Sequence, residues 1–273
     1  MKWVVSITGA ILFGSATLAD VLEFEGMVHP SDRGIITTRI DGVVETVFHQ
    51  SGAKVTAGAP LIQLDETDAR LVLDMAKARL KKAEAGFTAA TVRANRLREL
   101  QKRGLAAEAS ASPAVTDQKI AEAQLAVARA EVAAAQIALN RAVIRAPISG
   151  VVSKATAIQG MFIEVETNQG LGEVIVIDPV LVAYDVAYDT RLTTMAQAGV
   201  SSLEELFERL SVSVSLMDGT VVRDALSPER ASHELNDAGK LTVWLRVPNP
   251  DQILRPGLKV RVTSKLSQSG ASK

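Results

Sequence analysis

Residues that could do acid–base or metal chemistry are few in this sequence, and they are scattered. The three histidines, His29, His49 and His233, fall in unrelated segments and show no metal-ligand spacing. The chain has no cysteine, which excludes disulfides, zinc–thiolate sites, thiol nucleophiles and iron–sulfur clusters. No glycine-rich phosphate loop, nucleophile elbow or Ser/His/Asp grouping can be assembled. The sequence therefore predicts neither an enzyme nor a protein that holds a metal or another cofactor.

One group of carboxylates does lie close together in the chain. Asp65, Glu66 and Asp68 have the spacing of a pair that could share acid–base work. A simpler interpretation places them at the N-terminus of a helix, where the helix macrodipole favours acidic side chains. We expect this structural role.

Composition excludes a second class of function. The chain has 273 residues with 30 basic and 31 acidic side chains, a net charge of −1, and 4% aromatic residues. Nucleic-acid binding proteins carry a basic surface and aromatic side chains for stacking, so we expect no nucleic-acid partner. The length leaves room for more than one domain.

The first residues have the pattern of a secretory signal peptide. Met1 and Lys2 form a short positive segment, residues 3–18 are uncharged and mostly apolar, and a cleavage site follows near Ala19. The alternative is an uncleaved anchor helix, for which this stretch is short, since a span needs ~17–25 residues. We expect cleavage, and a mature protein outside the cytoplasm, in a bacterial periplasm.

Residues 66–145 carry a seven-residue hydrophobic repeat that is typical of a coiled coil. Large apolar residues and alanines occupy the a and d positions; in the first half these are Leu73, Ala76, Leu80, Ala83, Phe87, Ala90, Ala94 and Leu97, and in the second half Leu125, Ala128, Val132, Ala135, Leu139 and Ala142. The alanines let two helices approach closely. Charged residues between them predict a solvated face: Lys77, Lys81, Lys82, Glu84, Arg93, Arg96, Arg98 and Glu99.

The two helical segments are separated by RGLAAEASASPAV. Gly104 is a helix stop after two basic residues, and Ser112 with Pro113 has the pattern of an N-cap followed by a first helical residue. We predict one helix over residues 66–102 and a second over 113–144, each on the order of 50 Å long. The short connection makes them antiparallel. A bundle core is the alternative, but no other helices of matching length exist, so a projecting hairpin is favoured.

The same phrase stands on both sides of this hairpin. GVVETVFHQSGAKV begins at Gly42, and GVVSKATAIQGMFI begins at Gly150. Neither copy has enough strands to bury a face alone. Because the hairpin returns the chain to its starting point, we expect the two halves to form one small β-sandwich. Glycines in both copies are predicted to supply turns where positive φ is cheap, namely Gly42, Gly52, Gly58, Gly150 and Gly160.

Beyond residue 176 the pattern changes to alternating strands. Four strands are predicted, over residues 180–186, 211–217, 241–247 and 258–264, with a further short one after the turn signal Asp218-Gly219. Ser202 to Glu205 is a capping box that opens one short helix ending near residue 210. These elements predict a compact β-barrel.

Two glycine-punctuated halves around a helical hairpin resemble the membrane fusion proteins, or periplasmic adaptor subunits, of the HlyD family, and most of all those of RND efflux pumps. The motifs GVV-x7-G, VIRAPISGVV, VIDPVLVAYDV and VPNPDQILRPGLKVRV carry the resemblance. It implies an elongated α+β multidomain fold, with a coiled-coil hairpin inserted in a lipoyl-like β-sandwich and a small β-barrel after it. The expected boundaries are 1–19 for the signal peptide, 20–34 for an N-terminal extension, 35–65 and 146–175 for the lipoyl-like halves, 66–145 for the hairpin, 176–266 for the barrel and 267–273 for a disordered tail.

The resemblance also implies partners. Family members bridge an inner-membrane transporter and an outer-membrane channel, and they self-associate into a ring on the periplasmic side of the inner membrane. Their hairpin tip docks the channel through an Arg, Leu and Ser pattern. Arg96 and Leu100 match this pattern, while Ala107 stands where serine is expected.

In one respect the sequence departs from fuller members of the family. The membrane-proximal domain that normally follows the barrel is expected to be truncated or missing. An adaptor of an ATP-driven, type I secretion exporter is an alternative, although such adaptors have longer coiled coils. A lipoyl or biotin carrier is a remote alternative, because the turn that would present the carrier lysine is replaced by the hairpin.

Overall fold

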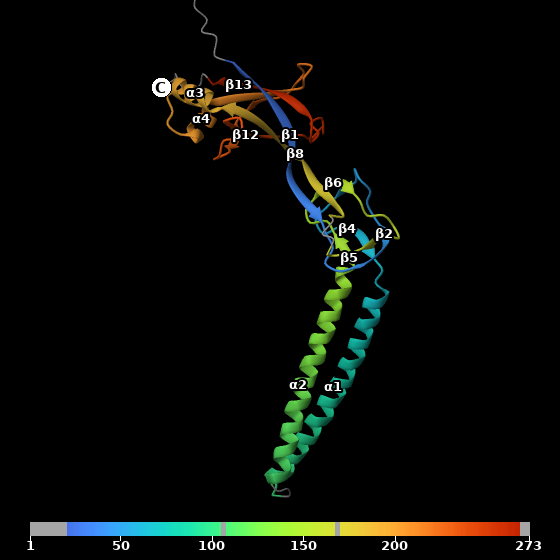
Figure 1. Cartoon of the computed structure of the whole chain (residues 1–273). Coiled ribbons are helices and arrows are strands. Elements are labelled where there is room, and N and C mark those ends of the chain that lie inside the picture. Colours follow the sequence, from blue (N-terminus) through green and yellow to red (C-terminus); the bar gives the residue numbers. More distant parts are fainter. Residues whose placement is uncertain (1–20, 105–107, 167–169, 268–273) are drawn as a thin grey trace, which may run out of the picture. The chain divides into compact units, whose positions relative to one another are not determined.

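A computed structural model of the chain describes residues 21–104, 108–166 and 170–267 (Figure 1). The predicted signal peptide, Ala107 and the tail beyond residue 267 lie outside the described residues. The chain divides into two compact units. We call Arg33–Ile175 the hairpin unit, and Met1–Asp32 together with Val176–Lys273 the barrel unit.

The predicted helical hairpin is confirmed. Helix α1 (Thr67–Lys102) and helix α2 (Glu108–Arg141) lie side by side and run antiparallel, as Figure 1 shows. All fourteen predicted a and d side chains are buried or partly buried, with Ala94 and Ala142 fully buried. The seam between the helices is therefore the one that the heptad pattern predicts.

The predicted start of the second helix is wrong. Helix α2 begins at Glu108, and Pro113 lies inside it. Residues 108–114 include three alanines, which favour a helix, and Pro113 is close enough to the helix start that it removes one backbone hydrogen bond and crowds the carbonyl of residue 109 without ending the helix. The helix also ends at Arg141, because Val143 begins a strand.

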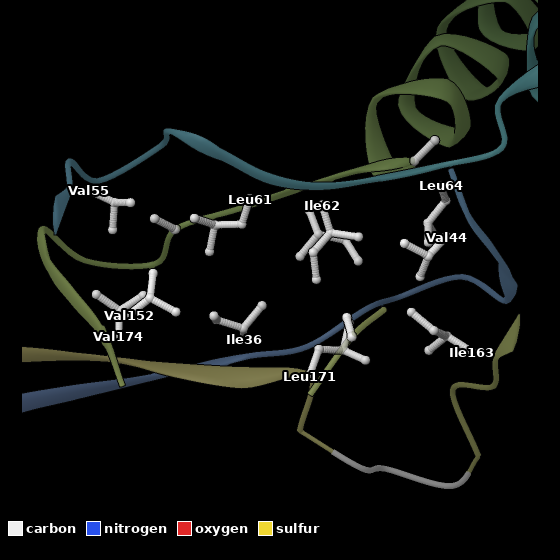
Figure 2. Packing of buried hydrophobic residues seen from close by; sticks show 14 residues of the cluster. Ile36, Val44, Val55, Leu61, Ile62, Leu64, Val152, Ile163, Leu171 and Val174 are labelled. Atoms are coloured by element: carbon white, nitrogen blue, oxygen red, sulfur yellow. The ribbon is translucent and has the colours of Figure 1, made fainter. Parts of the chain in front are cut away.

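The β-part of the hairpin unit is built from both halves of the repeated phrase. Its strands are β2 (Gly42–Val47), β3 (Lys54–Val55), β4 (Pro60–Leu64), β5 (Val143–Arg145), β6 (Gly150–Ala155) and β7 (Phe162–Ile163). One hydrophobic core takes residues from the segments before and after the hairpin. Figure 2 shows Val55 and Val152 at one end of this core, and the residues that match them in the repeat, Ile163 and Val44, at the other.

The two copies of the phrase exchange matching backbone hydrogen bonds. The Gly52 N–H donates to the carbonyl of Val152 (2.7 Å), and the Gly160 N–H donates to the carbonyl of Val44 (2.8 Å). The strand registers match as well, since Gly42 pairs with Ile163 just as Gly150 pairs with Val55. Each half thus closes on the other, which explains why the phrase occurs twice.

The predicted turn glycines fall into two groups. Three have left-handed backbones with φ of +93°, +81° and +82°: Gly52, Gly58 and Gly160. For Gly42 and Gly150 the turn assignment is wrong, because they begin strands β2 and β6. Gly150 is needed for a different reason. A Cβ atom on it would lie 2.3 Å from the carbonyl oxygen of Ile175, whereas a Cβ on Gly42 would come no nearer than 3.4 Å to Leu64.

The sheet of the barrel unit has the order β10-β9-β13-β1-β8-β12-β11. Its strands are β1 (Leu22–Ile36), β8 (Gly172–Ala187), β9 (Leu210–Ser215), β10 (Val221–Leu226), β11 (Pro228–Ala231), β12 (Lys240–Val247) and β13 (Lys259–Leu266); β1 and β8 contribute residues to both units. The inward side chains of these strands form a second hydrophobic core, rich in valine.

Three elements of the barrel unit were not predicted. The N-terminal extension forms β1, which pairs with β13, and β11 pairs with β12. Helix α3 (Tyr188–Ala198) precedes the predicted helix α4 (Leu203–Arg209) and ends at Gly199, which has φ of +63°. The N-cap of α4 at Ser202 is confirmed, because the Glu205 N–H donates to the Ser202 hydroxyl (3.2 Å); the Glu205 carboxylate accepts the N–H of Ser201 (3.2 Å), one residue before the N-cap.

The close approach at Gly150 generates a test with an internal control. We expect Gly150→Ala to destabilise the chain by about 3 kcal/mol, since the new methyl group would overlap a backbone carbonyl that is fixed in β8. Gly42→Ala changes the matching position of the repeat and should alter stability by less than about 1 kcal/mol. The measurement is urea unfolding of both variants. Equal losses in the two variants would contradict this explanation.

Candidate functional site

The structure places two of the three predicted docking residues near the tip of the hairpin. Arg96 is exposed on α1 and makes no hydrogen bond or ion pair with any described residue. Leu100 is one helical turn further along, on the same face, and is partly buried. Ala107 lies outside the described residues.

Local backbone contacts determine where α1 ends. The Arg103 N–H donates to the carbonyl of Glu99 (3.2 Å), and the Gly104 N–H donates to that of Gln101 (2.9 Å). Gly104 then turns the chain with φ of +74°, a conformation that glycine adopts at little cost. Gly104 therefore ends α1, one residue after Arg103.

A polar cluster links the two helices just before the tip. Arg98 donates to Gln118 of α2 (2.9 Å) and to Asn95 of its own helix (2.8 Å), and Gln118 donates to the Thr91 hydroxyl (3.2 Å). The assignment of Arg98 to the solvated face is wrong. Its heptad position flanks the seam, so its long side chain reaches the partner helix. That position was the one signal in the sequence that could have revealed the cluster.

The tip end of α1 is strongly basic. Residues 91–104 hold five basic side chains and one acidic side chain, a net charge of +4. Glu99 is paired with Arg103 (3.1 Å) and Arg98 is held in the polar cluster, while Arg93, Arg96 and Lys102 are exposed. Cations at a helix C-terminus interact favourably with the macrodipole. The exposed ones also offer donors to a partner that presents carboxylates or carbonyl groups.

The acidic cluster lies at the opposite end of the hairpin and has the predicted structural role. The carboxylate of Asp65 accepts the Thr67 N–H (2.9 Å) at the start of α1. Contacts from the Thr67 side chain and its backbone N–H hold the pKa of Asp65 below its ordinary value. Glu66 pairs with Arg70 and accepts a hydrogen bond from Gln63 (3.3 Å). These carboxylates anchor the first turn of the helix.

Two further features bear on the site. Within residues 21–104, 108–166 and 170–267, no three histidine or acidic side chains come together in a way that could hold a metal ion. In the same ranges, no helix combines the length and the apolar character that crossing a bilayer requires.

Comparison with known proteins identifies the family. A family model described as "RND MFP, barrel-sandwich hybrid domain" matches residues 34–178, just over half of the chain. The chain belongs to the RND membrane fusion proteins. The matched segment begins eight residues before the first copy of the repeated phrase, includes the whole hairpin and ends after the second copy, so it coincides closely with the hairpin unit.

Relatives of this membrane fusion protein are similar in sequence to it over more of its length than the family model covers. It is 26% identical to the membrane fusion protein MtrC of Neisseria gonorrhoeae over 94% of this chain and 62% of the relative. It is 30% identical to the efflux pump periplasmic linker BepF of Brucella suis over 89% of this chain and 58% of the relative. The chain thus spans about three fifths of the length of these relatives.

A solved structure shares the fold. The crystal structure of a MacA–MexA chimeric protein, which contains the Pseudomonas aeruginosa MexA α-hairpin domain, superposes with a TM-score of 0.64 at 17% identity. The match covers 92% of this chain and 80% of that one. The expected fold class, a helical hairpin with β-rich domains, is confirmed.

The lowered pKa of Asp65 generates a pH prediction. A carboxyl whose pKa is depressed by folding adds stability above its ordinary pKa of 3.8, and this stability is lost as the pH falls through the lowered value. Asp65→Asn should therefore reduce the free energy of unfolding at pH 6, and its difference from the wild type should shrink as the pH falls below 3.8. Urea unfolding across this pH range measures it.

Asp68→Asn is the matched control. It removes an acid from the same helical turn, but Asp68 forms no hydrogen bond with the described residues. A difference from the wild type that is the same at pH 6 and pH 2.5 for Asp65→Asn would contradict the capping role.

Proposed function

We propose that this chain is a periplasmic adaptor that links an inner-membrane transporter of the RND type to an outer-membrane channel in a tripartite efflux pump. The observation that carries the proposal is a β-domain assembled from two halves, from which a hairpin of two long helices projects and ends in an exposed basic tip. The printed name of the relative BepF, an efflux pump periplasmic linker, supports the same assignment.

The architecture suits a mechanical function. The hairpin is held by a narrow seam of alanines and larger apolar residues along its length, and by the Arg98–Gln118 contact near its tip. At its base, the Leu64 N–H donates to the carbonyl of Ala142 (2.8 Å), which joins the two ends of the hairpin. Because the two helices are joined at the base and again near the tip, the hairpin can hold its tip at a fixed distance from the β-domain. A protein that bridges two partners requires this.

The tip is the surface that we assign to the channel. Arg96 is exposed and uncommitted to other described residues, and Leu100 offers apolar surface one turn away. We infer that Arg96 donates to carboxylates or carbonyl groups of the channel while Leu100 packs against it. Several copies side by side would form a ring that encloses the conduit, with the mature protein in the periplasm and associated with the inner membrane.

The test is affinity capture of the tagged full chain from native membranes, followed by mass spectrometry. We expect a transporter and a channel to co-purify with the wild type. With Arg96→Asp, the amount of co-purified channel should fall by about 90% or more, since the variant replaces a donor by a repelling carboxylate. The amount of co-purified transporter should stay the same.

Lys82→Asp is the matched control, because Lys82 occupies the same heptad position two heptads from the tip and is also exposed. It makes the same change of charge about 21 Å away along the helix, at 1.5 Å per residue. Retention of the channel by Lys82→Asp and its loss from Arg96→Asp would support the tip assignment. Equal loss from both would refute it, and absence of both partners from the wild type would refute the adaptor function.

A further inference from the structure

The barrel unit contains a cavity that the proposed adaptor function does not use. It lies where helices α3 and α4 cover the sheet, and its walls come from both helices and from strands that include β1, β8, β12 and β13. Its volume is about 40 Å³. A water molecule needs roughly 10–15 Å³ by this measure, so the cavity has room for a group of about three or four non-hydrogen atoms.

A cationic side chain with an unpaired donor reaches this cavity. Arg191 of α3 lines it, and the Nε atom of Arg191 is buried with no hydrogen-bond partner among the described residues. The guanidinium carbon lies 5.4 Å from the centre of the Tyr188 ring, so an aromatic face covers one side of the cation. No acidic residue lines the cavity. Arg191 therefore supplies positive charge that no protein carboxylate there balances.

Two hydroxyl groups line the same space. Ser264 of β13 and Tyr184 of β8 are 5% and 4% exposed, and neither hydroxyl forms a hydrogen bond with a described residue. A third hydroxyl, that of Thr194, is already bonded to the carbonyl of Thr190 (2.8 Å). Buried polar groups usually have partners, and among the described residues the Arg191 Nε is the one buried side-chain atom that lacks a hydrogen-bond partner. A ligand in the cavity could supply that partner, and the two hydroxyls could contribute further hydrogen bonds.

The rest of the wall is apolar. Phe24, Leu206 and Phe207 are among its members, and the rings of Phe24 and Tyr184 lie 5.3 Å apart. An occupant that is entirely polar would leave this surface uncovered. A cation would be repelled by Arg191, and a dianion such as sulfate would have a single cation to balance two charges and little room.

We propose that the cavity is a binding site for a short monocarboxylate, a molecule of the size of acetate. Its carboxylate accepts hydrogen bonds from Arg191 Nε and from the Ser264 and Tyr184 hydroxyls, and its methyl group lies against the apolar wall. One negative charge balances the one positive charge, and the four non-hydrogen atoms match the volume. The site belongs to the barrel unit alone and does not depend on the channel-docking tip.

The experiment is a titration of the ¹⁵N-labelled full chain with sodium acetate, with sodium chloride at equal ionic strength as the reference, followed through the arginine Nε–H signals by NMR. We expect one such signal to shift and to saturate on the order of 10 mM, because so small a ligand binds weakly. That signal should be missing from Arg191→Gln. Chloride should produce no saturable shift of it.

Three variants make the outcome decisive. Arg230→Gln removes a surface cation of the same unit, one that lies over Trp244, and should leave acetate binding unchanged. Ser264→Ala should weaken binding by about fivefold through the loss of one hydrogen bond. Ala231→Leu should fill the cavity and abolish acetate binding while it keeps Arg191. This variant replaces Arg191→Gln in the test if Arg191→Gln does not fold.

Two results would overturn the proposal. The first is a linear response to acetate without saturation, which would mean that the cavity takes up only water. The second is a saturable response that chloride reproduces or that Ala231→Leu retains, which would mean that the carboxylate is not recognised in this cavity.

Discussion

The backbone exchange between the two copies of the repeated phrase is the constraint on which the hairpin unit depends. Gly52 donates to Val152 and Gly160 donates to Val44, so each half supplies the donor that completes the other. Neither half has a core of its own, because the buried residues come from both sides of an insertion of about eighty residues. The domain forms only if residue 64 and residue 142 are brought together. The antiparallel seam of the hairpin does this, and its apolar contacts thereby also stabilise the β-core.

Much of this could be predicted from the sequence because the signals are periodic or repeated. A heptad pattern sustained over both helices predicts fourteen seam residues that are all buried or partly buried, since burial in a two-helix hairpin follows from position along the helix. The prediction left out Ala114, which is also buried. The repeated phrase predicts the pairing of the halves, because neither copy has enough strands to bury a face alone. The resemblance to the membrane fusion proteins assigned Arg96 and Leu100 to the tip, in agreement with the midpoint of the predicted hairpin.

The errors have local physical causes. Ser112 and Pro113 are a good helix start in isolation, but the helix begins four residues earlier, at Glu108, and includes both of them. From the sequence, Gly150 resembles a turn glycine. In the fold, a glycine is required there because the carbonyl of Ile175 leaves no room for a Cβ atom, and this carbonyl is near only in the folded state. Arg98 has the polarity of a surface residue and acquires a partner on α2. Strand β1 was overlooked because its neighbours β13 and β8 lie far along the chain, and no short-range pattern reports such pairing.

The hydrogen bond between Leu64 and Ala142 separates the hairpin from the domain that carries it. Apart from Ala142, which belongs to both, the residues of the β-core lie on one side of this bond and the seam of the helices lies on the other. Matched insertions or deletions of one heptad in α1 and α2 would thus change the reach of the hairpin by about 10 Å without disturbing the core. The length of the hairpin can therefore change independently of the β-domain that supports it. It can be matched to the width of the periplasm without any change in that domain.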